Sequence, residues 1–305
     1  MKENEYEIII IGGSYSGLSA AMALGRSLRR TLIIDNGAPC NQQTPHSHNF
    51  LTQDGKTPTE ISTLGRQQVE QYQTVAFLDD WAATSEMTGA GFAITTQSGK
   101  VFSSSKLIVA SGIKDQKPAI HGFSECWGIS VVHCPYCHGY EFRGQKTAIF
   151  ANGERAFHLS GLVNNLTSDL TILTNGKADF TADQLNNLRY RNIQVTETAI
   201  TEFKHEKGHV KSVILNDGKI KEFSAVYAAI PFVQHSDIPR SLGCELTPQG
   251  HIKIDATYHT TVPGIFACGD NSSPLRSVAN AVAAGNYVGA VVNKELTTEQ
   301  FQLPE

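Results

Sequence analysis

The glycine-rich turn near the N-terminus constrains the fold more than any other feature of this sequence. Residues 7–12 form a short apolar run, residues 18–28 are rich in Ala and Leu, and residues 31–35 form a second apolar run. Short continuous runs rich in β-branched residues are typical of strands buried on both faces of a parallel sheet. The pattern therefore predicts a strand–helix–strand unit around the turn at residues 12–17.

The turn itself predicts dinucleotide binding. Its sequence follows the G-x-G-x-x-G fingerprint, except that Ser14 replaces the middle glycine. Glycines allow the tight turn, and the helix N-terminus offers free N–H groups to a pyrophosphate. Asp35 ends the second strand, where it would accept hydrogen bonds from a ribose. The predicted cofactor site comprises Gly12, Gly13, Ser14, Tyr15, Ser16, Gly17 and Asp35.

Two later strands end where a cofactor can approach the backbone. The apolar run at residues 107–109 leads into the small residues Ala110, Ser111 and Gly112, and such turns permit close backbone approach. A second run ends in Asp270 and precedes an Ala/Val-rich helix at about residues 275–294. Ligands of open α/β sheets bind at the carboxyl ends of the strands. We therefore add Ala110, Gly112 and Asp270 to the predicted site.

The middle of the chain repeats the strand–helix–strand pattern. Its three segments lie at residues 146–151, 154–165 and 170–174. Ala151 replaces the first glycine of the fingerprint, and the second strand ends without an acid for a ribose or an arginine for a 2′-phosphate. We expect a nicotinamide-nucleotide-like module with a weak site, and a purely structural role for the unit stays open. The residues of this weak site are Asn152, Gly153 and Glu154.

The closely spaced cysteines at residues 134–137 have several interpretations. Zinc needs about four ligands, and no second CxxC or paired histidines lie at motif spacing. Cys-x-x-Cys-His also marks covalent haem attachment, which normally needs export, and a non-functional buried pair is a further alternative. Redox use is favoured, because a CxxC pair lowers one thiol pKa and a neighbouring histidine can carry a proton. We predict a redox pair of Cys134 and Cys137, assisted by His138, and no metal.

Composition limits the classes of partner. The 305 residues suffice for about two domains, and a net charge of −4 does not favour nucleic acid or an anionic membrane surface. No apolar run reaches the ~18 residues of a membrane span. The acidic residues 1–7 lack the basic start of a secretory signal, so we expect a cytoplasmic protein. The remaining cysteines are expected to be buried small hydrophobes: Cys40, Cys126, Cys244 and Cys268.

Taken together, these motifs resemble those of low-molecular-weight thioredoxin reductases, which are FAD-dependent pyridine nucleotide–disulfide oxidoreductases, over nearly the whole chain. The resemblance implies an α/β fold with two Rossmann-like (three-layer ββα) dinucleotide-binding domains. The FAD domain would be discontinuous, at residues 1–114 and 236–305. The NAD(P)H-like domain, residues 115–235, would carry the redox CxxC. A homodimer that exposes its cysteines by rotating the domains is also implied.

The resemblance assigns roles to individual residues. Cys137 would face the flavin, and Cys134 would be the thiol that exchanges with the substrate. Asp270 would hold the ribityl chain. Further flavin contacts are implied for Asn41, His48, Gly269, Ser277, Val278 and Ala279.

Two departures from the family pattern leave the direction of electron flow open. His138 stands where the family has an acid, and the arginine cluster for NADPH is absent. The Cys-x-x-Cys-His-Gly sequence resembles a branch that includes gliotoxin- and holomycin-type dithiol oxidases, which pass electrons to oxygen. The alternatives are reduction of a thioredoxin-like protein or small disulfide, with electrons from NAD(P)H or a ferredoxin-type donor, oxidation of a small dithiol, and a non-enzymatic flavin redox sensor.

Overall fold

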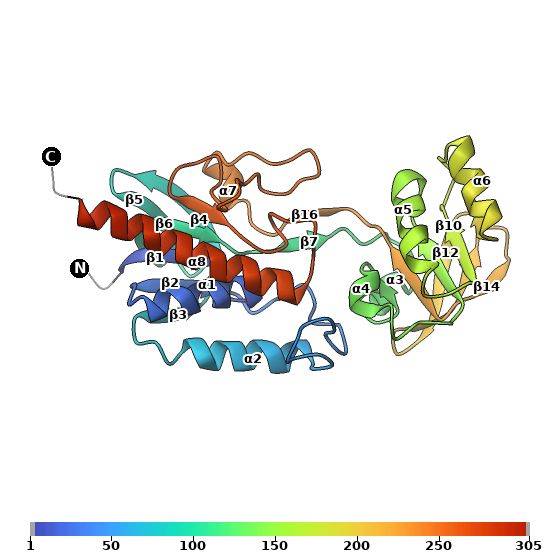
Figure 1. Cartoon of the computed structure of the whole chain (residues 1–305), viewed down its shortest axis with the longest axis horizontal. Helices are drawn as coiled ribbons and strands as arrows, with labels where there is room; N and C mark the ends of the chain where they lie inside the picture. Colours follow the sequence, from blue (N-terminus) through green and yellow to red (C-terminus); the bar gives the residue numbers. More distant parts are fainter. Residues whose placement is uncertain (1–3, 303–305) are drawn as a thin grey trace. The chain divides into compact units, whose positions relative to one another are not determined.

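The computed structural model describes residues 4–302 and divides into two compact units (Figure 1). Unit 1 comprises Met1–Gln42, Phe50–Lys114 and Phe232–Glu305, and unit 2 comprises Gln43–Asn49 and Asp115–Pro231. The chain passes between the units along β7 (Ile113–Asp115) and β16 (Phe232–Gln234), which pair as a two-stranded sheet. Within residues 4–302, none of the helices combines the length and apolar character needed to cross a lipid bilayer.

Unit 1 is built on a seven-stranded sheet. Its order is β3-β2-β1-β6-β5-β4, and β17 also pairs with β6. The strands are β1 (Glu5–Ile11), β2 (Thr31–Asp35), β3 (Val75–Asp79), β4 (Ala82–Thr88), β5 (Gly91–Thr96), β6 (Val101–Val109) and β17 (Ile265–Ala267). The pairs that involve β1, β2, β3 and β17 are parallel, whereas β4–β5–β6 is antiparallel. Residues 8–11 are fully or almost fully buried, as predicted for a strand covered on both faces.

Two helices cover one face of this sheet with their backbones in close contact. α1 (Tyr15–Arg26) and α8 (Val278–Phe301) lie along each other in Figure 1. A Cβ atom at Gly285 would collide with the carbonyl oxygen of Ser16, and one at Gly289 would lie 2.7 Å from that of Ala20. Glycine therefore permits this approach. α8 runs to residue 301, beyond the predicted end at 294, because no glycine or proline interrupts residues 290–301.

Unit 1 has two further helices among the described residues. They are α2 (Pro58–Val69) and α7 (Ile238–Ser241). α2 begins at a capping box, in which the Thr57 hydroxyl accepts from the Glu60 N–H and the Glu60 side chain accepts from the Thr57 N–H. This cap fixes the start of α2 at Pro58.

Unit 2 repeats the architecture with a five-stranded parallel sheet. Its order is β11-β10-β9-β15-β8. The strands are β8 (Val131–Val132), β9 (Thr147–Phe150), β10 (Leu170–Leu173), β11 (Gln194–Thr196) and β15 (Ala225–Ala228). The helices are α3 (Phe123–Cys126), α4 (Pro135–His138), α5 (Gly153–Val163) and α6 (Ala182–Tyr190). A separate antiparallel sheet holds β12 (Ile200–Glu206), β13 (His209–Leu215) and β14 (Ile220–Glu222). Both units thus have the predicted α/β architecture.

Candidate functional site

The carboxyl edge of the unit 1 sheet brings three predicted turns together. Gly12 has φ +103°, and a Cβ atom there would collide with the carbonyl oxygen of Ala110. The Ala110 N–H donates to the carbonyl of Ile11 at 2.8 Å. From the third turn, the Asn271 amide donates to the carbonyl of Val109 at 2.8 Å. These contacts hold the turns after β1, β6 and β17 side by side.

The N-terminus of α1 keeps its first-turn N–H groups available. Its cap residue, Ser14, makes no side-chain cap hydrogen bond, and no acidic residue lies in the first turn. Helices otherwise satisfy these N–H groups by side-chain caps, water or ligands. Among the described residues, the buried oxygens Ser111 Oγ and Asn271 Oδ1 also lack a hydrogen-bond partner. This set of polar groups fits the phosphates and hydroxyls of FAD.

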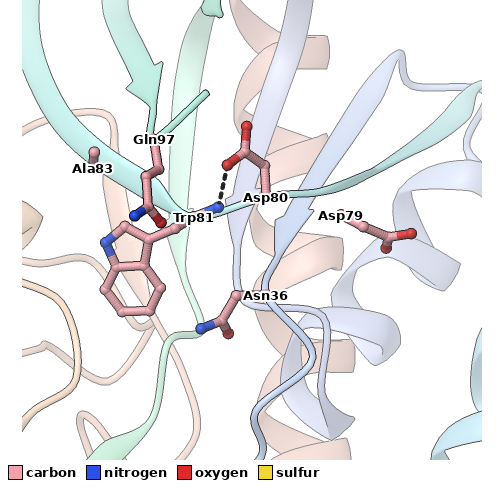
Figure 2. A pocket seen from close by; sticks show the side chains of 6 residues that line it. All are labelled: Asn36, Asp79, Asp80, Trp81, Ala83 and Gln97. Carbon is pink, nitrogen blue, oxygen red and sulfur yellow. Dashed lines mark hydrogen bonds between the residues drawn. The ribbon is translucent and has the colours of Figure 1, made fainter. Parts of the chain in front are cut away.

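A pocket of about 550 Å³ opens beyond the ends of β2 and β3 (Figure 2). Figure 2 shows the Trp81 indole, the Asn36 amide and the Gln97 amide around one hollow. Asp80 also lines it, and hydrogen bonds, first from the Ser98 hydroxyl, lower the pKa of its carboxyl to about 2. The pocket lies next to Asp35, the predicted ribose acid. Trp81 was not among the predicted residues, because it lies between β3 and β4, and neither strand was predicted.

The predicted residues around Asp270 lie in unit 1. The Arg276 guanidinium Nε is 3.5 Å from Asp270 Oδ2, and the Asn41 amide donates to the Tyr15 hydroxyl at 3.1 Å. Ser277 is the N-cap of α8, so Val278 and Ala279 open this helix as predicted. Cys40 is exposed, with its Sγ 4.0 Å from Asp270 Oδ2. The prediction that Cys40 is buried is therefore wrong, because its loop lies on the surface.

The CxxC pair lies on a single helical turn of unit 2. Cys134 is the N-cap of α4, and its sulfur accepts a hydrogen bond from the Cys137 N–H at 3.2 Å. Both thiols are partly exposed. Tyr136, between them, is 65% exposed, and Tyr140 follows at 68%. A partner can therefore reach the pair between aromatic side chains.

His138 is held as a neutral imidazole. Burial lowers its pKa to about 4, and the nearby His48 adds to the lowering, whereas Glu141 opposes it. The His48 Nε2 atom lies 3.6 Å from Glu141 Oε1. The segment that carries His48 belongs to unit 2, so this predicted flavin contact lies with the residues that follow the CxxC.

Burial makes three other thiols less reactive than the redox pair. Burial raises the pKa of Cys126 to about 11 and that of Cys268 to about 12, and it also raises the pKa of Cys244. All three are buried, as predicted. A thiol reacts as its thiolate, so these three are inert near neutral pH.

The N-terminus of α5 is bonded by the chain itself. The Asn152 side-chain oxygen accepts from the N–H groups of Gly153 at 2.8 Å and Asp179 at 2.9 Å. The Asn152 amide donates to the carbonyl of Lys177 at 2.8 Å. A Cβ atom at Gly153 would lie 3.1 Å from the carbonyl oxygen of Asp179. The segment after β10 thus folds over the turn where a pyrophosphate would bind.

Acidic groups add to this closure. Glu154 lies in the first turn of α5, where its carboxylate accepts from the Gln184 amide at 2.7 Å. The Asp179 carboxylate would lie 3.6 Å from a Cβ atom at Gly153. Such groups repel a negative phosphate. The weak site of Asn152, Gly153 and Glu154 is therefore covered by the chain itself and negatively charged.

Comparisons with known proteins agree on one family. Residues 6–285 match the model of the family described as pyridine nucleotide-disulphide oxidoreductase. The chain is 30% identical to thioredoxin reductase aclD of Aspergillus oryzae, over 97% of this chain and 98% of the relative. It is 29% identical to thioredoxin reductase tcpT of Claviceps purpurea, over 97% and 96%. The crystal structure of an oxidoreductase from Agrobacterium tumefaciens superimposes with a TM-score of 0.90 at 36% identity, over 96% of this chain and 99% of the other.

Proposed function

Because the chain belongs to the pyridine nucleotide-disulphide oxidoreductase family and is a thioredoxin reductase-like, FAD-dependent thiol–disulfide oxidoreductase, we propose that it works as a dithiol oxidase. Its substrate is a small dithiol, and its electron acceptor is dioxygen. The redox pair is Cys134 and Cys137. Electrons do not enter from NAD(P)H.

The closed N-terminus of α5 carries this proposal. A pyrophosphate needs free N–H groups at the glycine-rich turn. Here the Gly153 N–H already donates to Asn152, and Asp179 covers the turn. The α1 turn of the same chain has no such cap, so one dinucleotide turn is open and the other is closed. FAD is assigned to the open one.

The FAD site is proposed from the residues of unit 1. The first-turn N–H groups of α1 would hold the pyrophosphate, Asp35 the adenosine ribose, and the pocket beside Trp81 the adenine. Asp270 and the N-terminus of α8 would lie at the flavin end. FAD, when bound, supplies two-electron chemistry between the cysteine pair and dioxygen.

The substrate dithiol is oxidised in two successive thiol–disulfide exchange steps. A substrate thiolate attacks Sγ of Cys134 in the oxidised pair, the S–S bond breaks, and Cys137 leaves as a thiolate. The second substrate thiol, after losing its proton, attacks the substrate sulfur of the mixed disulfide and releases Cys134. The substrate is then a disulfide, and the pair is a dithiol that holds the two electrons. Bound FAD would carry them to dioxygen, and the two substrate protons would complete hydrogen peroxide.

His138 suits the proton transfer in this direction. Its low pKa leaves the imidazole neutral near pH 7, and a neutral imidazole accepts a proton from a thiol. Glu141 raises the His138 pKa, so it stabilises the imidazolium that forms. We propose that His138 takes a thiol proton and passes it to solvent.

The opposite direction is the second candidate. The relatives aclD and tcpT are named thioredoxin reductases, which favours a thioredoxin-like protein or small disulfide as the electron acceptor. A ferredoxin-type carrier would then supply the electrons in place of NAD(P)H. The homodimer and the cytoplasmic location stay predictions.

Anaerobic titration of the purified yellow protein distinguishes the two directions. The protein is titrated separately with NADPH, NADH and dithiothreitol, and air is then admitted. We expect bleaching of the flavin absorbance by dithiothreitol alone, followed by rapid recovery in air and about one hydrogen peroxide per flavin. Bleaching by stoichiometric NADPH or NADH would contradict the closed α5 site. Bleaching by dithiothreitol without recovery in air would contradict the oxidase direction.

A further inference from the structure

Tyr227 is a buried tyrosine whose hydroxyl has nothing to bond. It lies on β15 and is 1% exposed. Its hydroxyl oxygen is among the buried atoms without a hydrogen-bond partner in the described part of the chain. Buried polar groups are nearly always paired, because an unpaired one is costly. Phenylalanine would fill the same space without this cost, so the hydroxyl needs an explanation.

The strand that carries Tyr227 lies beside the segment that leads into the redox pair. In the parallel pairing of β15 with β8, Tyr227 lies opposite Val132, two residues before Cys134. Val132 and Tyr227 also pack in one buried cluster, so the two side chains lie on the same face of the sheet. Burial is the first cause that raises the pKa of the phenol, and the charges of Cys134 and Glu141 are the next two. The phenol therefore stays protonated and has a hydrogen to donate.

We propose that Tyr227 is a positioning residue that donates its phenolic hydrogen to the thiolate of Cys134. While Cys134 carries no negative charge, its sulfur is a weak acceptor, and the hydroxyl is idle. When the disulfide opens and Cys134 carries a negative charge, the hydroxyl gains a strong acceptor. Hydrogen bonds to charged groups are the stronger kind, so the bond favours the thiolate.

The other titratable groups of the cluster come from two segments. Cys137, His138 and Glu141 belong to the segment that carries Cys134, and His48 comes from the loop at residues 43–49. The Glu141 carboxylate is the competing acceptor for the phenol. Because Glu141 is 39% exposed on its side chain, water stabilises its charge. The Cys134 thiolate is therefore the acceptor that a hydrogen bond from the buried Tyr227 hydroxyl stabilises more.

This bond assists exchange in either direction. In the oxidase direction, Cys134 is the leaving thiolate, and a more stable thiolate leaves faster. In the reductase direction, Cys134 is the attacking group, and the bond raises the fraction present as thiolate. The inference rests on the redox role of Cys134 in the proposed function, and it does not depend on the electron donor or acceptor.

The pH profile of Cys134 alkylation tests the bond without catalytic turnover. The full-length protein carries Cys40→Ser and Cys137→Ser, so that Cys134 is its one reactive thiol. The initial rate of iodoacetamide labelling is followed by mass spectrometry against pH, with and without Tyr227→Phe. We expect Tyr227→Phe to move the midpoint up by about 1 pH unit and to slow labelling near pH 7 about tenfold. An unchanged midpoint would overturn the proposal.

Two controls separate the bond from a structural role. Tyr190→Phe removes the same hydroxyl from an exposed tyrosine of the same unit, and we expect it to leave the midpoint unchanged. In the oxidised protein with all its cysteines, Tyr227→Phe should leave the thermal midpoint equal or higher, because the hydroxyl is unpaired. A lower midpoint would show that the hydroxyl has a structural partner, and this result would also overturn the proposal. Failure of the oxidase assay alone affects neither measurement.

Discussion

At the scale of single residues, environment decides what each ionisable group does. Cys126 and Cys268 are the same residue type as Cys134, yet burial raises their pKa to about 11 and about 12. Cys134 instead lies at a helix cap, where a backbone N–H donates to its sulfur. Burial also moves the pKa of His138 below its ordinary value. Identical side chains thus become inert or reactive according to their surroundings.

His138 makes the protein sensitive to acid. Its pKa is about 4 when folded and 6.5 in its unperturbed form, so the unfolded chain binds a proton first as the pH falls. Stability is therefore full above about pH 6.5 and decreases as the pH falls from 6.5 to 4. We expect the free energy of unfolding of His138→Asn to decrease by about 1–3 kcal/mol less than that of the parent protein over this pH range. Urea unfolding at a series of pH values measures it.

A matched variant controls for the removal of any histidine. His209 is exposed, and His209→Asn should leave the pH dependence of stability unchanged; equal effects of the two variants would contradict the assignment. The His138 variant also tests proton transfer. We expect slower flavin reduction by dithiothreitol with a changed pH profile, and an unchanged rate between about pH 6 and 9 would rule out that role.

At the scale of elements, close helix packing supports the cofactor site. α1 and α8 meet at Gly285 and Gly289, where side chains would enter the neighbouring backbone. α1 follows the dinucleotide turn, and α8 begins at Ser277 beside the predicted flavin end. The contact between these helices therefore fixes the two ends of the proposed FAD site relative to each other.

Adding a single methyl group to α8 should push α1 and α8 apart. Gly285→Ala places a Cβ atom against the carbonyl oxygen of Ser16, which is backbone and cannot rotate away. We expect the free energy of unfolding to fall by about 1–3 kcal/mol, and bound FAD to be lost more readily. Thermal unfolding and the ratio of flavin to protein absorbance measure both effects.

The chain offers a matched control for this substitution. Gly161 lies in α5, and a Cβ atom there meets nothing within 4 Å. Gly161→Ala should raise the free energy of unfolding by about 0.5–1 kcal/mol, because alanine favours helix more than glycine. If Gly285→Ala were as stable as Gly161→Ala, the close packing of α1 on α8 would be wrong.

At the scale of the whole molecule, the two units divide the chemistry. The open dinucleotide turn and the pocket beside Trp81 belong to unit 1, whereas the cysteine pair and His138 belong to unit 2. Unit 2 keeps the form of a nucleotide-binding module but closes its own binding turn with Asn152 and Asp179. Unit 2 therefore carries the redox pair on a module whose nucleotide-binding turn is covered by its own residues.

This division predicts that cofactor binding and dithiol chemistry are separable. The double variant Cys134→Ser/Cys137→Ser should still bind FAD, because the residues proposed to hold the cofactor lie in unit 1. We expect it to lose flavin reduction by dithiothreitol, because the pair is the entry point for electrons. Stopped-flow absorbance measures the reduction. The buried pair Cys126→Ser/Cys244→Ser is the control and should retain it; reduction of the Cys134/Cys137 variant at the parent rate would contradict the division.

Local patterns were sufficient for the two strand–helix–strand units and the family. Periodicity, glycine spacing and a Cys-x-x-Cys-His run act over a few residues, so they can be read without knowing what packs where. Packing alone decided that Cys40 is exposed, that Trp81 lines a pocket, and that Tyr227 pairs with Val132. It also decided that Asp179 covers the α5 turn. Each of these facts joins residues from separate segments, and such contacts form only when the sheet brings distant strands together.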